Sequence, residues 1–297
     1  MKMNPVYRKE LKLSVRSPKI VMTILGYNIV LLIITLLAFY TTYGSRQKYN
    51  FTSFQSVLTL YIMLATIEFI LLVLVIPAFT ASAISGEREK QTLDILLTTR
   101  LKPFQIVIGK LASSISMMML LVISSFPTLS VVFVIGGVQL RDLPALFLVF
   151  FVTAFFVGSI GIFFSTLFRN TAPSTVFTYL TIFFIMIGTI AILGIMYKIV
   201  NKQIAEISYE DIAMKLVADL GDLILLLLVN PLVTLFHTLF SQTGQYNVFL
   251  SYINKLGTCN SFILEHWFLI SILVQLGIAF LFLLLAAKLL NPIKRRK

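Results

Sequence analysis

The sequence has little charge and almost no cysteine. Charged residues occupy 12% of its 297 positions, about half the share that a soluble domain of this size carries. Cys259 is the single cysteine, so an intramolecular disulfide and a metal cage built from cysteines are both excluded. Apolar residues take the place of charge: they make up 58% of the chain and occur in long blocks.

Six of these blocks are long enough to cross a bilayer. About 20 apolar residues in a helix match the thickness of the hydrocarbon core. A continuous apolar block of this length fits neither a half-buried strand nor an amphipathic surface helix. The sequence therefore predicts an all-α integral membrane protein with one transmembrane domain over residues 1–297. We expect the spans at Ile20–Tyr43, Val57–Thr80, Leu111–Gly136, Pro144–Phe168, Ser174–Tyr197 and Trp267–Leu290.

The distribution of basic residues predicts which loops face the cytoplasm. Most of the 24 lysine and arginine residues lie before the first span, between the second and third spans, or after the sixth. Because cytoplasmic loops are enriched in these residues, we expect both termini to be cytoplasmic. The net charge of +12 then has the anionic lipids of the inner leaflet as its counter-charge, and nucleic acid is not expected as a partner.

The first 19 residues are predicted to form a short helix on the inner leaflet. Pro5 is typical of a first helical turn, and Tyr7, Leu11 and Val15 recur every four residues between basic side chains. This pattern indicates a basic amphipathic helix that lies at the interface. The span that follows is too long for the apolar part of a cleaved signal peptide.

A seventh apolar block, Leu223–Phe240, is interrupted in its middle by Asn230-Pro231. Proline lacks a backbone donor and breaks a helix at that point. A seventh crossing would also place the basic C-terminus outside, against the charge rule. We therefore interpret this block as a re-entrant or interfacial hairpin on the outer face, within a long outer loop over residues 198–266.

Common catalytic motifs are absent from the sequence. It contains no Gly-x-x-x-x-Gly-Lys-Ser/Thr phosphate loop, no His-Glu-x-x-His and no Gly-x-Ser-x-Gly. We therefore predict that the chain is not an enzyme and binds no cofactor itself. The two histidines, His237 and His266, have no cysteine or carboxylate at ligand spacing, so we interpret them as interfacial polar residues and expect no metal site.

The cytoplasmic loop over residues 81–110 has the most distinctive pattern. Alternating charges at Glu87–Lys90 precede a leucine stripe formed by Leu93, Leu96 and Leu97, and Pro103 then begins the next helix. This pattern fits a solvated interfacial loop. It also fits a docking helix, in which charge provides specificity for a cytoplasmic partner and leucines provide contact area.

This loop closely resembles the signature loop of type-2 ATP-binding-cassette (ABC) exporter permeases. That family has Gly-Glu-Arg-Glu-x-x-Thr-Leu-x-x-Leu-Leu, followed by Pro-x-x-Ile-x-x-Gly-Lys. Gln91 and Asp94 stand where the family usually has a small residue and often a glutamate. The matching residues are Gly86, Glu87, Arg88, Glu89, Thr92, Leu93, Leu96, Leu97, Pro103, Ile106, Gly109 and Lys110. The resemblance extends to the segments Lys9–Leu11, Arg16–Pro18 and Asn230-Pro231.

The resemblance implies a division of labour between subunits. Residues Gly86–Leu97, Asp94 included, would form a coupling helix in a groove of a separate ATPase subunit, which binds the ATP. The hairpin with Asn230, Pro231 and His237 would form an extracellular gate. Two copies of the permease, or this chain and a related permease, would join two ATPase subunits in a bacterial cytoplasmic membrane. The scarcity of polar residues in the spans favours a hydrophobic or amphipathic cargo.

Glu68 is the unusual residue within the spans. A carboxylate at mid-membrane is costly, so it should pair, face water or be protonated, and the sequence offers Thr66 and Gln275 as partners. Glu68 is either a packing residue or a pathway residue. A proton site there would suit an ion-coupled secondary transporter, which is the alternative function, although paired broken spans in two halves are missing. A membrane scaffold is a third class.

The fourth predicted span carries a stripe of small residues. Such residues allow two helices to approach closely. We expect them to pack within the chain rather than against a second copy. They are Ala154, Gly158, Gly161 and Ser165.

Overall fold

The computed structural model describes residues 5–15, 17–43, 54–98, 102–135, 138–207 and 219–290. These residues are helical almost throughout and contain no strand. Among them, six helical stretches are long and apolar enough to cross a membrane, which confirms the predicted all-α membrane fold. The stretches are Ile20–Tyr40, Val57–Glu89, Pro103–Ser130, Leu140–Leu167, Thr171–Gln203 and Trp267–Leu290. Arg16 and the basic C-terminal residues 291–297 lie outside the described residues.

Contacts divide the chain into two compact units. The first unit comprises Met1–Tyr179 and Leu276–Lys297, and the second comprises Leu180–Gln275. Each unit is described separately below.

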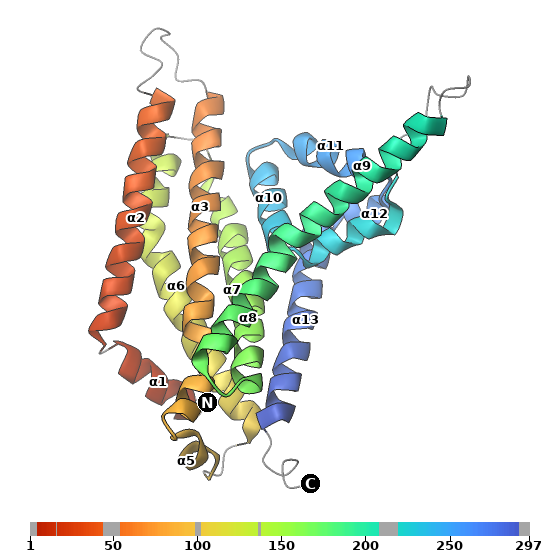
Figure 1. Ribbon diagram of the computed structural model, residues 1–297. Coiled ribbons are helices and arrows are strands. Elements are labelled where there is room, and N and C mark those ends of the chain that lie inside the picture. The colour runs from red at the N-terminus through yellow and green to blue at the C-terminus, as the bar shows by residue number, and fades with distance from the viewer. Residues whose placement is uncertain are drawn as a thin grey trace. The chain divides into compact units, whose positions relative to one another are not determined.

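Three long helices form the centre of the first unit. They are α3 (Phe54–Thr80), α6 (Pro103–Ile135) and α7 (Leu143–Leu167), and they contact one another. A single turn, η2 (Leu140–Asp142), leads into α7, while α2 (Pro18–Tyr43) packs on α3 and α6 (Figure 1). The outward face of α2 keeps many large apolar side chains exposed, as expected for a helix that faces lipid.

Helix α1 (Pro5–Val15) contacts one of the three central helices. It packs on α6, where Val6 joins a buried cluster with Ile84 and Ile106, and the hydroxyl groups of Tyr7 and Ser116 lie 3.0 Å apart. The helix is therefore present where the sequence predicts one. Its place at the membrane surface remains a prediction.

The stripe of small residues brings α7 close to its neighbours. A Cβ atom on Gly158 would lie 2.8 Å from Cδ1 of Leu111, and one on Gly161 would lie 2.8 Å from Cβ of Thr80. At Gly161 the close atoms include a Cβ atom and a backbone nitrogen, so only glycine fits there, whereas the end of the Leu111 side chain near Gly158 can turn aside. The stripe therefore packs inside the chain, as the sequence analysis favours.

The fifth span is longer than the sequence predicts. It consists of α8 (Thr171–Phe183), one π-helical turn, η3 (Phe184–Gly188), and α9 (Thr189–Ile207), which continues past the predicted end at Tyr197. The prediction relied on the apolar run, which ends at Lys198. Polar residues end an apolar run, but they do not end a helix. The third span is extended similarly, because α6 begins at Pro103, a favoured first helical residue, and not at Leu111.

The second unit contains the bend predicted at Asn230-Pro231. A 3₁₀ helix, η4 (Gly221–Val229), meets α10 (Pro231–Gln242) at an angle of 92°. Two shorter helices, α11 (Tyr246–Leu256) and α12 (Ser261–Glu265), lead to α13 (Trp267–Leu290). The core of the unit surrounds the fully buried Trp267. The predicted break is confirmed, and the position of the hairpin on the outer face remains a prediction.

Candidate functional site

The loop after α3 folds into two short helices joined by a tight turn. Helix α4 (Ser85–Glu89) ends at Lys90, and α5 (Leu93–Leu97) follows. Gln91 in the turn has φ = +58°, a left-handed conformation that is uncommon for residues with a Cβ atom. Thr92 closes the turn, because its amide donates to the carbonyl of Glu87 and its hydroxyl donates to Oε2 of Glu87, both over 2.9 Å.

Helix α7 satisfies the free amides at the start of α4. The hydroxyl oxygen of Ser165 accepts hydrogen bonds from the amides of Ile84 and Ser85, over 2.8 and 2.9 Å. The hydroxyl of Ser85 donates to the carbonyl of Ala81, and so does that of Ser174. A helix start buried in this way requires such partners, and Ser165 therefore fixes where α4 begins.

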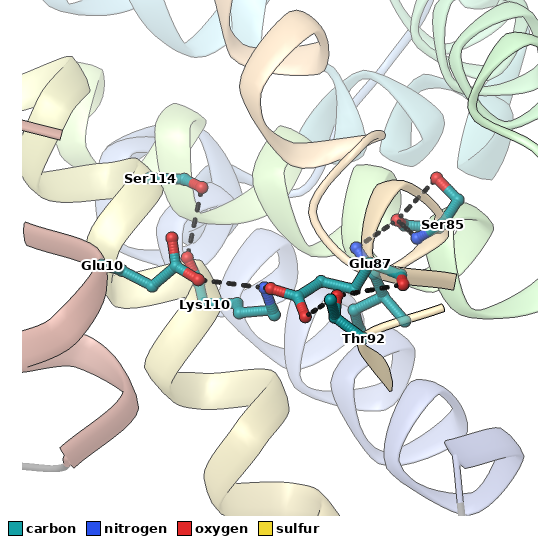
Figure 2. A network of polar contacts seen from close by, with 8 residues as sticks. Glu10, Ser85, Glu87, Thr92, Lys110 and Ser114 are labelled. Atoms are coloured by element: carbon teal, nitrogen blue, oxygen red, sulfur yellow. Dashed lines mark hydrogen bonds and ion pairs between the residues drawn. The ribbon is translucent and has the colours of Figure 1, made fainter. Parts of the chain in front are cut away.

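Glu87 belongs to an ion-pair network that joins three helices. The Nζ atom of Lys110 on α6 lies 3.0 Å from Oε1 of Glu87 and 3.1 Å from Oε1 of Glu10 on α1 (Figure 2). The lysine side chain is only 4% exposed, whereas the side chains of Glu87 and Glu10 are 23% and 28% exposed. Two carboxylates around one buried ammonium compensate its loss of hydration, so α1, α4 and α6 are linked through Lys110.

The next two charges bind the ends of two other helices. The guanidinium of Arg88 donates to the carbonyls of Phe168 and Thr166, over 2.8 and 3.2 Å, at the C-terminal end of α7. The carboxylate of Glu89 accepts the amide of Thr171 over 2.7 Å, at the first turn of α8. Each charge thus lies at the helix end whose dipole it complements. The alternating charges connect α4 with α6, α7 and α8.

The leucine stripe faces the core of this chain. Leu93 is 6% exposed and lies in a cluster with Ile106 and Leu111, against which the half-buried Leu96 and Leu97 pack. The side chain of Asp94 lies outside the described residues. The residues that remain exposed at the turn are Glu89, Lys90, Gln91 and Thr92. A partner would therefore meet the turn, while Leu93 anchors α5.

A polar cavity of about 380 Å³ adjoins the network. Glu10, Glu87 and Lys110 line it together with Ser113 and Ser114 of α6. Solvent therefore reaches one side of the ion pairs. The attraction between these charges is consequently weaker than in a fully buried pair.

Glu68 is buried between two helices of the first unit. It is 1% exposed, and its Oε1 atom is hydrogen-bonded to the hydroxyl of Ser125 on α6. Thr66, one of the partners offered by the sequence, instead donates to the carbonyl of Ile62, and Gln275 donates to Thr234 within the second unit. Ser125, one of several serines in α6, could not be singled out from the sequence, because an apolar run does not reveal which of its polar residues faces another helix.

The Ser125 hydroxyl has two neighbouring acceptors and one proton. Its oxygen lies beside Oε1 of Glu68 and 2.8 Å from the carbonyl of Val122. A protonated Glu68 would donate to Ser125, which would then donate to Val122, so that both hydroxyl protons have an acceptor, while Oε2 of Glu68 has no partner among the described residues. This geometry favours a neutral packing residue.

Asn230 holds the bend of the second unit. Its Oδ1 atom accepts the amide of Leu232, which caps α10, and its amide group donates to the carbonyl of Met186 and the hydroxyl of Thr189, both over 2.8 Å. Pro231 occupies the first turn of α10. The bend is thereby attached to the π turn of the fifth span.

His237 packs among aromatic rings within the second unit. Its ring lies edge-on to those of Tyr246 and Phe249, with centroids 5.6 and 5.0 Å away, and parallel to that of Phe268. Asn230, Pro231 and His237 therefore belong to one packed unit, and their role as a gate remains a prediction.

A protein-family model matches nearly the whole chain. The family model described as ABC-2 family transporter protein matches residues 4–290. This range includes the two short helices at residues 85–97 and the bend at Asn230. A search of curated proteins finds no match.

Proposed function

The chain belongs to the ABC-2 family of transporter proteins, and we propose that it exports its cargo with energy from ATP hydrolysed by a separate ATPase subunit. As a multi-pass membrane protein of this family, it is the permease subunit of an ABC transporter. The finer assignment concerns where the ATPase binds and how its movement enters the membrane.

One observation carries the proposal: three consecutive charges of α4 bind three different helices. Glu87 pairs with Lys110 on α6, Arg88 binds the end of α7, and Glu89 binds the start of α8. A solvated interfacial loop does not require such fixed attachments. A segment that transmits force does, because slack at any attachment would absorb the movement.

The mechanism follows from these attachments. ATP binding would close the ATPase subunits, and the exposed turn at Glu89–Thr92 would move with them. The displacement would reach α6, α7 and α8 through the side chains of α4, and α1 through Glu10. The ATPase favours the outward-open conformation only to the extent that its closed form binds that conformation more tightly than it binds the other one.

The proposed assembly contains two permeases and two ATPase subunits in the cytoplasmic membrane of a bacterium. Both termini of each permease, and the turn at Glu89–Thr92, would face the cytoplasm. The hairpin around Asn230 would form the outer gate. The permeases are identical copies or a related pair, and the apolar spans favour a hydrophobic or amphipathic cargo.

A charge reversal at the turn tests the ATPase contact. Lys90 is exposed and makes no described ion pair, so Lys90→Glu should leave the permease folded. We propose that Lys90 faces an acidic side chain of the ATPase, so that Lys90→Glu creates a like-charge contact; we then expect co-purification of the ATPase subunit to fall at least about tenfold. Lys198→Glu, at an exposed lysine predicted on the opposite face, is the matched control.

The measurement is the ratio of ATPase to permease after purification, together with transport. Unchanged ratio and transport in Lys90→Glu would remove the turn from the ATPase contact. An equal loss in Lys198→Glu would indicate a general electrostatic effect and would also contradict the proposal.

A further inference from the structure

The second unit contains an apolar pocket that the proposed transport cycle does not use. It has a volume of about 530 Å³, within the range of about 300–1,000 Å³ typical of ligand pockets. Four helices line it: α9, η4, α10 and α11. Its wall includes Leu193, Phe236 and Phe240, and nearly all of its surface is apolar.

We propose that this pocket binds one acyl chain of an anionic phospholipid, with the phosphate beside the ammonium of Lys255. The apolar lining of the pocket suits a hydrocarbon chain, and the ammonium of the lining residue Lys255 suits a phosphate.

The apolar part rests on the position of α9. The lining residues Ile190, Leu193 and Gly194 belong to the membrane-spanning stretch Thr171–Gln203. A pocket walled by a membrane span is reached by lipid more readily than by a water-soluble ligand. A Cβ atom at Gly194 would meet nothing within 4 Å, so the glycine leaves space in the wall where a larger residue would reduce the volume.

The polar part rests on Lys255 and Tyr252. Lys255 is the only charged residue that lines the pocket within the described part of the second unit. Its Nζ atom lies 5.7 Å from the centre of the Tyr252 ring, a cation–π contact that holds the ammonium at the pocket. An ammonium without a lining carboxylate attracts an anionic headgroup. Tyr197 and Tyr252 add rings of the kind that are enriched at membrane interfaces.

The test uses the full chain, purified and reconstituted in phosphatidylcholine vesicles. Phosphatidylglycerol with a photoactivatable diazirine in one acyl chain is added, and the labelled peptides are identified by mass spectrometry. We expect labels on α9 and α11. The phosphatidylglycerol probe should label these helices about fivefold more than the matching phosphatidylcholine probe does. This factor corresponds to the attraction of about 1 kcal/mol between one lysine and an anionic lipid surface.

Two variants separate the parts of the proposal. Gly194→Leu should reduce labelling of α9 and α11 at least about fivefold by filling the pocket, while Gly277→Leu, whose Cβ also meets nothing within 4 Å, should leave it unchanged. Lys255→Gln should keep the labels but remove the preference for phosphatidylglycerol.

Several outcomes would overturn the proposal. These are labelling spread evenly over all spans, equal labelling in Gly194→Leu and wild type, and equal use of both probes by the wild type. A diazirine fatty acid that labels the same helices more strongly would identify a free fatty acid as the occupant. Disulfides formed between two chains carrying Phe236→Cys would identify a second copy of this chain instead. Loss of ATPase co-purification in Lys90→Glu concerns the first unit and leaves this result unaffected.

Discussion

The side chain of Thr80 occupies the space that any residue larger than glycine would need at position 161. A Cβ atom on Gly161 would lie 2.8 Å from Cβ of Thr80 and 3.3 Å from the amide nitrogen of Ala81. Rotation of the threonine cannot relieve these contacts, because they involve its Cβ atom and the backbone. The distance between α3 and α7 therefore depends on this glycine.

We predict that Gly161→Ala destabilises the protein by about 1–3 kcal/mol, because α7 must move away from α3. The measurement is the unfolding temperature in detergent, with Gly277→Ala as the control, since that position has open space around it. Equal unfolding temperatures for the two variants would show that α3 and α7 are not in tight contact.

Lys110 is predicted to matter more than either of its partners. Lys110→Met leaves two carboxylates side by side, whereas Glu10→Gln still leaves Glu87 to neutralise the buried ammonium. We expect a loss of about 1 kcal/mol for Glu10→Gln and a clearly larger loss for Lys110→Met, measured by unfolding in detergent. Equal losses in the two variants would show that the three residues do not form one network.

The turn at Gln91 stores strain that glycine would relieve. We expect Gln91→Gly to stabilise the protein by about 1 kcal/mol, because glycine adopts φ = +58° without a steric penalty. Lys90→Gly is the control: Lys90 has φ = −80°, so glycine brings no such gain there. A stability gain in the control, or none in Gln91→Gly, would contradict the strained turn.

Glu68→Gln should retain wild-type transport. The amide can donate to Ser125 just as a protonated carboxyl can, so the contact between α3 and α6 survives. Glu68→Ala should lower the unfolding temperature, because it leaves a cavity and removes a hydrogen-bond partner of the Ser125 hydroxyl. Transport assayed in vesicles decides between the roles: a strong loss in Glu68→Gln would restore the pathway interpretation.

Asp219 gives the second unit a pH dependence. Hydrogen bonds from the Thr258 hydroxyl and from the amides of Gly221 and Thr258 hold the pKa of Asp219 below its usual range. A lowered folded-state pKa gives stability that is present above the unfolded pKa of about 4 and is lost as the pH falls through the folded value. Wild type should therefore unfold at a higher temperature than Asp219→Asn at pH 7, and this difference should shrink at pH 3. A constant difference would contradict the carboxylate's role.

The spans could be predicted because apolar length alone determines them. The sixth was predicted at Trp267–Leu290, where the structure places α13. Proline also predicted the bend at Asn230. Helix ends were less predictable, since Lys198 ends the hydrophobic run of the fifth span but not its helix.

The residues of the candidate site could be named, but their contacts could not. The sequence singled out Glu87, Arg88 and Glu89, whereas their partners at Lys110, Phe168 and Thr171 lie 23, 80 and 82 residues away in the chain. Only folding brings such positions together. For the leucine stripe, periodicity shows that one face is apolar but not which neighbour covers it, and a contact of this segment with an ATPase remains a prediction. Here Leu93 is covered by the chain itself.

The hydrogen bonds from Asn230 to the π turn affect the geometry of the fifth span. A π turn holds one residue more than an α-helical turn, and moving that residue along the helix rotates the residues that it passes by about 100°. Because Asn230 binds the carbonyl of Met186 and the hydroxyl of Thr189, the extra residue is pinned at this position. The bend at Asn230 thus fixes the direction in which the first residues of α9 face around the helix axis.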